Sequence, residues 1–177
     1  VSIRNISAIF VARGPGSFNG LRVGISTAKG LAFSLGVPVY GVSTLSMAAY
    51  QHAYSGLPVC PIFDARRGEI ATALYQLQKG EWYQSMSECL TTLEVLCTKI
   101  TRRTTFCGDL SADVSSRLQN RLGNKAIIPT PAFRIRRAAF LIELGKRDLA
   151  SGKPGDPAAL QPLYLRRPAI TKPRKRG

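Results

Sequence analysis

Acidic residues are scarce in this sequence, which has 10 Asp and Glu against 25 Lys and Arg and a formal net charge of +15. The imbalance is greatest at the C-terminal end. Residues 1–129 hold 13 basic and 7 acidic side chains, whereas residues 130–177 hold 12 and 3. Such a surface attracts RNA, DNA or an acidic protein through long-range, salt-sensitive forces. It is also compatible with a merely solvated surface, so charge alone leaves the partner open.

Histidine occurs once, at position 52. A histidine-based metal site or a Ser-His-Asp triad would require this residue, and no ligand or nucleophile is spaced around it. We therefore interpret His52 as half-buried packing on a helix. The phosphate-binding motif GxxxxGK[ST] is also missing, because Asn19 and Leu21 stand five positions after Gly14 and Gly16.

Neither a disulfide framework nor a membrane segment is indicated. The four cysteines include no CxxC pair, so free thiols are expected. No apolar run reaches the roughly 18 residues of a membrane span, and no signal peptide is recognisable. The 177 residues, 45% of them hydrophobic, are enough for a sizeable core. We expect a cytoplasmic protein that makes no membrane contact.

One stretch near the N-terminus predicts a buried strand, a tight turn and a long helix. Ala8–Ala12 is a short apolar run, which Gly14–Gly16 ends with a Gly-Pro-Gly turn. Ser17 can cap a helix that runs to about Leu35, and Gly36 suits a left-handed helix end.

The predicted helix has two distinct faces. An apolar stripe at spacings of three and four is expected to cover a sheet; it consists of Phe18, Leu21, Ile25, Ala28, Ala32 and Leu35. Gly20, Gly24 and Ala28 form a flat line of small residues. Glycine inside a helix costs about 0.5–1 kcal/mol relative to alanine, so another backbone is expected to approach this line. That backbone belongs either to the same domain or to a neighbouring subunit.

Two turns combine charged side chains with backbone donors. Arg13 and Arg22 flank the glycine turn, whose N–H groups open a helix and could hold an anion. The simpler interpretation is that the glycines only permit the turn. Asp64 and Glu69 belong to a second turn with two arginines, where a catalytic carboxylate is conceivable. A turn held by Asp64 and local ion pairs is again the simpler interpretation.

The rest of the chain predicts two groups of strands and helices. Residues 1–56 follow a β-α-β-α pattern, which favours parallel strands covered by helices. Residues 57–151 predict a mixed sheet, with strands at 59–64, 69–77, 82–87, 104–108 and 126–129 and helices at 93–100, 114–122 and 133–151. The inner face predicted for the last helix consists of Ala138, Leu141, Ile142, Gly145 and Leu149. Beyond it we expect a docked extended segment and a disordered basic tail.

Four blocks, in order along the whole chain, resemble the TsaB (YeaZ) family. They are ARGPGSFNGLRVGISTAKGLA (12–32), GVSTL (41–45), FDARRGEI (63–70) and LQPLYLRRP (160–168). The GPGSF-x-GLR-x-G block is highly specific, and the other blocks are moderately so. Asn19 stands where the family usually has threonine, which is a mild departure.

The resemblance implies an α/β protein with the actin/hexokinase/Hsp70-like ATPase superfold, built from two ribonuclease H-like lobes. It also implies an N-terminally truncated chain with an incomplete first lobe. Residues 1–56 would be the remainder of the first lobe, 57–168 the second lobe and 169–177 the basic tail. The strand at 8–12 would then expose an edge.

The resemblance further implies a non-catalytic scaffold or activating subunit with no cofactor or metal of its own. Its partners would be a TsaD-like subunit, which transfers a threonylcarbamoyl group to the adenosine next to the anticodon of tRNA, and a TsaE-like ATPase. Self-association through the first-lobe helices is also implied. The partner interface would consist of Phe18, Gly20, Leu21, Gly24, Thr27, Ala28 and Leu31. Contacts to an anion or RNA would come from Arg13, Arg22, Arg166 and Arg167.

Two other functions remain open from the sequence. One is a free-standing enzyme of the same superfold, such as a kinase or a peptidase-like hydrolase. The other is a basic RNA-binding module, which is supported by charge alone.

Overall fold

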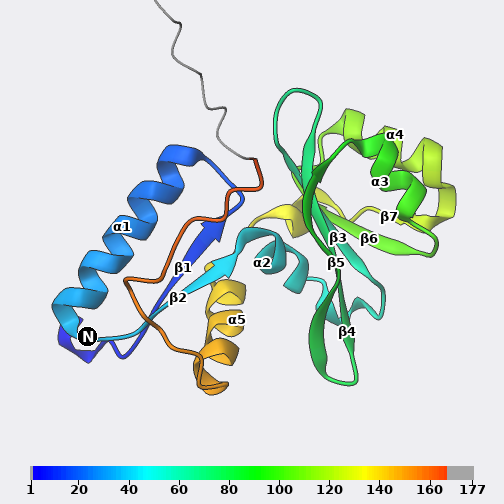
Figure 1. The fold of residues 1–177 in the computed structure, drawn as a ribbon. Helices are drawn as coiled ribbons and strands as arrows, with labels where there is room; N and C mark the ends of the chain where they lie inside the picture. The colour runs from blue at the N-terminus through cyan, green and yellow to red at the C-terminus, as the bar shows by residue number, and fades with distance from the viewer. Residues whose placement is uncertain (1, 167–177) are drawn as a thin grey trace, which may run out of the picture.

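Two sheets form the framework of the computed structural model, which describes residues 2–166 (Figure 1). The basic tail expected at 169–177 lies outside the described residues. The strands are β1 (Ile9–Gly14), β2 (Val39–Ser43), β3 (Val59–Asp64), β4 (Ile70–Gln78), β5 (Glu81–Thr91), β6 (Thr104–Gly108) and β7 (Ala126–Ile127). The α-helices are α1 (Phe18–Leu35), α2 (Thr44–Tyr50), α3 (Leu93–Lys99), α4 (Ala112–Leu122) and α5 (Ala138–Ala150). Short 3-10 turns are η1 (Ile3–Asn5), η2 (Ala53–Ser55), η3 (Gly123–Lys125) and η4 (Pro131–Arg134).

The first sheet consists of β1 and β2, which run parallel and are joined by α1. The helix begins where the Ser17 hydroxyl accepts a hydrogen bond from Gly20 N at 3.4 Å, and it ends at Gly36, whose φ is +66°. Ala28 and Ala32 are buried against Val39 of β2. The predicted strand, cap and helix end are therefore confirmed here, and so is the inner stripe at Ile25, Ala28 and Ala32, whereas Phe18 at its start is exposed.

The second sheet has the order β5-β4-β3-β6-β7 and is mixed, as the sequence predicts. Strands β3, β6 and β7 are parallel, whereas β4 and β5 form an antiparallel meander with β3. One core cluster packs α3 and α4 against the sheet through Leu96, Leu118 and Phe106. A second cluster packs α2 against β3 and β4 through residues such as Leu45 and Val59.

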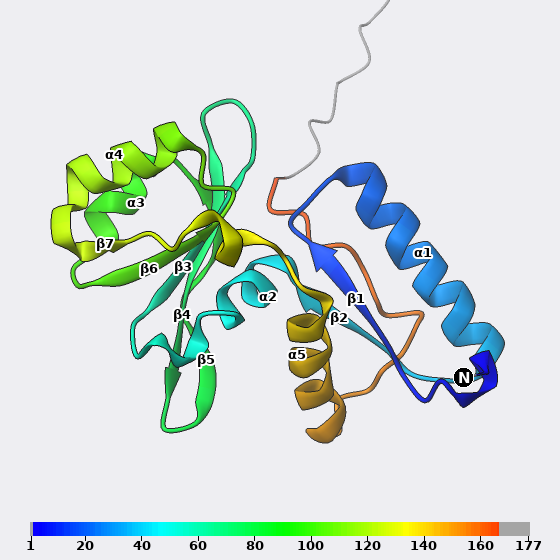
Figure 2. The ribbon, with the colours of Figure 1, turned by 180° about the vertical axis from the view of Figure 1, so that it is seen from behind.

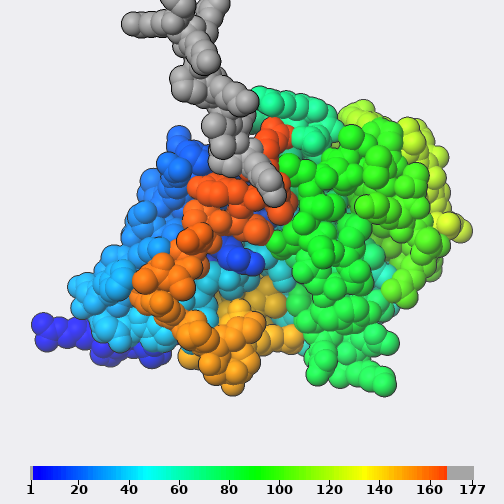
Figure 3. Space-filling view, viewed as in Figure 1, coloured from blue at the N-terminus to red at the C-terminus, as the bar shows by residue number. Residues whose placement is uncertain are grey.

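The chain then returns from the second sheet to the first. Figures 1 and 2 show α1 on one side of β1 and β2 and α5 on the other. Residues 153–166 follow α5 and lie across the first sheet, as the space-filling view shows (Figure 3). Leu163 N donates to Arg13 O at 2.7 Å, and Val39 N donates to Gly155 O at 3.0 Å. This confirms a docked extended segment, which bonds to the chain at Arg13, just beyond the strand predicted at 8–12, and at Val39 of β2.

The long helix predicted at 133–151 is wrong in its first part. Pro131 opens the η4 turn, and the Arg134 side chain donates to the carbonyl groups of Pro129 and Leu110. These contacts hold the chain out of helical geometry, so α5 begins only at Ala138.

The predicted inner face of α5 is also partly wrong. Leu144 and Gly145 are the buried residues of this helix, whereas Ile142 and Leu149 are each 42% exposed. The reason is that Leu144 and Leu141 pack into a cluster with Tyr50 of α2.

The sequence-based division into 1–56 and 57–168 stays a prediction. α5 and residues 153–166 contact the two-stranded sheet although they follow the five-stranded sheet in sequence. Across residues 2–166, no helix combines the length and the apolar character that a membrane crossing requires.

Candidate functional site

Four of the predicted interface residues lie together on a side of α1 that this chain does not cover. We call Gly20, Gly24, Thr27 and Leu31 the small-residue flank. A Cβ atom added at Gly24 would meet nothing within 4 Å, and one added at Gly20 would meet only the side chain of Ser17. Thr27 and Leu31 are exposed. The small size of the glycines is therefore not explained by packing within this chain.

The other three predicted interface residues contact their own chain. Ala28 is buried in the core of the first sheet, and Leu21 lies against the backbone of Gly14. Phe18 packs on Tyr164, with ring centroids 5.7 Å apart. The predicted set is therefore divided between an outer group and an inner group.

Two exposed apolar residues of α1 were missed by the sequence reasoning. Val23 is 68% exposed and Phe33 is 65% exposed. The available signal was that both fall outside the apolar stripe, where a helix facing water is normally polar. Lys29 is the only charged residue between positions 23 and 34. Low charge and exposed aromatic residues are typical of protein interfaces.

The arginines predicted to contact an anion do not form one cluster. The Arg22 guanidinium lies 4.0 Å from the centre of the Phe18 ring, and its Nε donates to the Tyr164 hydroxyl at 3.3 Å. Arg13 lines a cavity between the two sheets, and Arg166 pairs with Glu69. Arg167 lies outside the described residues.

The cavity between the sheets has a volume of about 380 Å³ and is lined by residues of both sheets and of α5. The Glu88 carboxylate accepts hydrogen bonds from the Ser43 and Tyr75 hydroxyls. Burial and the adjacent Glu88 raise the pKa of Tyr75 above its usual value, so this hydroxyl remains a donor at neutral pH. Tyr75 stacks on Trp82, with ring centroids 5.4 Å apart.

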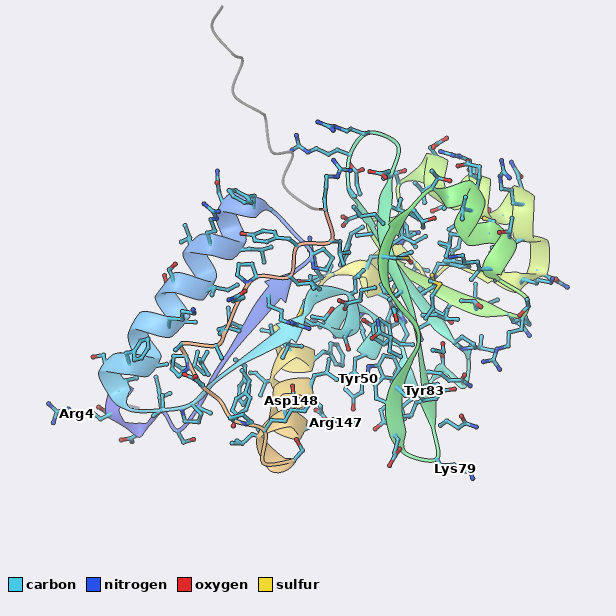
Figure 4. All side chains as sticks on the ribbon, viewed as in Figure 1. Arg4, Tyr50, Lys79, Tyr83, Arg147 and Asp148 are labelled. Atoms are coloured by element: carbon cyan, nitrogen blue, oxygen red, sulfur yellow. The ribbon has the colours of Figure 1, made fainter. Side chains whose placement is uncertain are left out.

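Basic residues stand at the edge of the same cavity. Figure 4 shows Arg147 and Asp148 on α5 and Tyr50 on α2. Arg147 donates to the Tyr50 hydroxyl at 2.7 Å, and Lys153 pairs with Asp148. The cavity therefore offers aromatic surface and both signs of charge to a small polar molecule.

A second cavity, of about 450 Å³, lies where β3 and β6 end. Asp64 and Asp109 line it. Asp64 Oδ1 accepts from Arg66 N at 2.8 Å, and Glu69 pairs with Arg166. Asp64 therefore holds the turn as expected, but the ion pair joins Glu69 to Arg166, which is distant in sequence, rather than to an arginine of the turn. Among residues 2–166, no group of three or more His, Cys, Asp and Glu side chains is placed to hold a metal ion.

His52 follows α2 and is half-buried. Burial lowers the pKa of its imidazole, so the ring is neutral at pH 7. Its Nε2 atom is buried and makes no hydrogen bond to any described residue. Half-buried packing is consistent with this environment, but the prediction that His52 lies on a helix is wrong, because α2 ends at Tyr50 and His52 lies in the turn before η2.

Comparison with known proteins identifies the family. A family model described as TsaD, tRNA N6-adenosine threonylcarbamoyltransferase, matches residues 1–170. TsaB of Bacillus subtilis, named a tRNA threonylcarbamoyladenosine biosynthesis protein, is 38% identical over 168 residues, which cover 92% of this chain and 71% of the relative. The chain belongs to the TsaB (YeaZ) family. TsaB of Escherichia coli is 39% identical over 99 residues, covering 54% of this chain and 42% of the relative.

Solved structures of TsaB (YeaZ) relatives share the fold. A Pseudomonas aeruginosa protein, described as uncharacterized with similarity to peptidase YeaZ, superposes with a TM-score of 0.77 at 27% identity. That match covers 94% of this chain and 76% of the other. YeaZ from the same organism gives a TM-score of 0.74 at 27% identity, with 93% and 77% covered. These matches confirm the predicted α/β fold of the actin/hexokinase/Hsp70-like superfamily.

Proposed function

We propose that this TsaB-family chain is a non-catalytic scaffold or activating subunit in the synthesis of threonylcarbamoyladenosine in tRNA. In this role it pairs with a TsaD-like subunit through the outer side of α1. A TsaE-like ATPase and tRNA bind to the resulting complex. When the chain forms a homodimer, the two copies contact each other through the same side of α1. The observation that carries the proposal is the uncovered small-residue flank.

The energetic argument concerns Gly20 and Gly24. Each glycine in a helix costs about 1 kcal/mol relative to alanine. Neither has a positive φ, and an added Cβ at either position would meet no close obstacle. The chain therefore gains nothing internally from these glycines. A second helix lying directly against them explains their presence, because small residues permit close approach of two backbones.

The chemistry of the described residues supports a subunit that does not itself transfer the group. The single histidine is neutral and half-buried. Glu88 is held by two hydroxyl donors, and Asp64 is engaged by a backbone N–H. The thiols of Cys60 and Cys107 are buried, and burial raises the pKa of each. None of these groups is arranged as an activated nucleophile beside a base.

The direct test is Gly24→Leu. The new side chain enters open space, so the melting temperature should be unchanged or higher, whereas affinity for the TsaD-like subunit of the same organism should fall at least about tenfold. Isothermal titration calorimetry measures the affinity.

Ser116→Leu is the matched control, since it adds the same side chain at an exposed position of α4, on the second lobe. It should leave the affinity unchanged. Equal affinities for Gly24→Leu and the unmodified chain would overturn the proposed interface. ATP turnover by the chain without partners would overturn the non-catalytic role.

A further inference from the structure

The turn between β3 and β4 holds two arginines in an unfavourable backbone conformation. Arg66 has a φ of +63° and Arg67 a φ of +59°. The left-handed region costs a residue other than glycine about 1–2 kcal/mol. Asparagine or glycine would occupy such positions with less strain. The hairpin itself therefore does not require arginine at either position.

Two further arginines lie beside this turn. Arg166 Nη2 donates to the carbonyl oxygen of Ala65 at 3.3 Å. The Arg136 guanidinium lies 5.0 Å from the centre of the Phe63 ring, near the end of β3. We call the four exposed arginines, Arg66, Arg67, Arg136 and Arg166, the arginine surface. They come from three separate segments, and Figure 1 shows the β3–β4 turn close to the last described residues.

At this surface four arginines stand against three carboxylates, an excess of one positive charge among the described residues. Three carboxylates lie nearby: Glu69 is neutralised by Arg166, Asp64 accepts a backbone hydrogen bond, and Asp109 lines the adjacent cavity. The sequence that continues from Arg166 contains no acidic residue. It adds five basic residues, namely Arg167, Lys172, Arg174, Lys175 and Arg176. Arg166, the last described residue, therefore belongs to the arginine surface, and the sequence that follows it is basic.

We propose that the arginine surface binds the phosphate backbone of RNA. A guanidinium group presents a planar fork of donors that matches phosphate oxygens. The closed turn already fixes the backbone of Arg66 and Arg67, so binding has to order only their side chains. The inference rests on the proposed function only in its choice of tRNA as the RNA.

The test measures binding of a fluorescently labelled, unmodified tRNA to the full chain without partners, over a series of salt concentrations. Arg66→Asn combined with Arg67→Asn should weaken binding about tenfold at low salt. The slope of log K against log salt should become shallower by about 2, because two phosphates are no longer neutralised by arginine. The melting temperature should stay the same or rise, because asparagine relieves the backbone strain.

The control removes two cations elsewhere, as Lys79→Asn combined with Arg4→Gln. Lys79 also has a positive φ, +51°, and Figure 4 shows it at the β4–β5 turn, at the opposite end of the sheet from the arginine surface. This control should keep the slope of the unmodified chain. Arg66→Lys combined with Arg67→Lys keeps both charges, so it should also keep the salt slope of the unmodified chain.

Equal slopes for the asparagine variant and its control would overturn the proposal. Equal affinity for polyglutamate of matched charge would overturn the assignment to RNA in favour of an acidic protein. Because calorimetry with the TsaD-like subunit measures pairing separately, failure of either proposal leaves the other interpretable.

Discussion

At the scale of single residues, burial controls the chemistry of the cysteines. The Cys60 thiol lies 3.3 Å from the Thr72 hydroxyl inside the second sheet. Burial raises its pKa from 9.0 to about 12. Burial also raises the pKa of the Cys107 thiol. The folded protein therefore holds both groups as protonated thiols at neutral pH.

This shift predicts a loss of stability in alkaline solution. Folding favours the protonated Cys60 thiol. Its contribution to the free energy of unfolding is therefore complete below pH 9 and is lost as the pH rises toward 12. Between about pH 8.5 and 10.5 the free energy of unfolding of the unmodified chain should fall about 2 kcal/mol more than that of Cys60→Ala. Urea unfolding at the two pH values measures the difference. Parallel decreases in the two proteins would show that Cys60 does not titrate in this way.

At the scale of elements, two helical glycines serve opposite purposes. A Cβ atom added at Gly145 of α5 would overlap the ring of Phe10 on β1, whereas one added at Gly24 of α1 would meet nothing. Gly145→Ala should lower the free energy of unfolding by about 1–3 kcal/mol through overpacking. Gly24→Ala should raise it by about 0.5–1 kcal/mol through helix propensity. Chemical denaturation of the two variants provides the comparison, and a change of the same sign in both would contradict this packing.

The elements also show how far the sequence could predict the structure. The start and end of α1 were predictable because Ser17 and Gly36 act locally. The start of α5 was not, because the Arg134 contact to Leu110 joins segments 24 residues apart. Spacing alone identified the glycines of the flank and placed Ala28 on the apolar stripe, but it could not show whether this chain or a neighbouring subunit would lie against Gly24. The arginine surface depends on a C-terminal arginine returning to a turn formed much earlier in the chain, which no local pattern indicates.

At the scale of the whole molecule, the two proposed binding surfaces occupy different parts of the structure. The outer side of α1 belongs to the first sheet, and the arginine surface lies at one end of the second (Figure 1). Neither surface covers the cavity between the sheets. The two proposals therefore assign a TsaD-like partner and RNA to separate surfaces, as a scaffold for tRNA modification would require.

The most direct measurement is reconstitution of the modification reaction. The full chain is combined with the TsaD-like and TsaE-like subunits of the same organism, a threonylcarbamoyl donor and unmodified tRNA, and threonylcarbamoyladenosine is measured by mass spectrometry. Product should form only when this chain and the TsaD-like subunit are both present, and Gly24→Leu should reduce it. Product formed at the same rate without this chain would contradict the account.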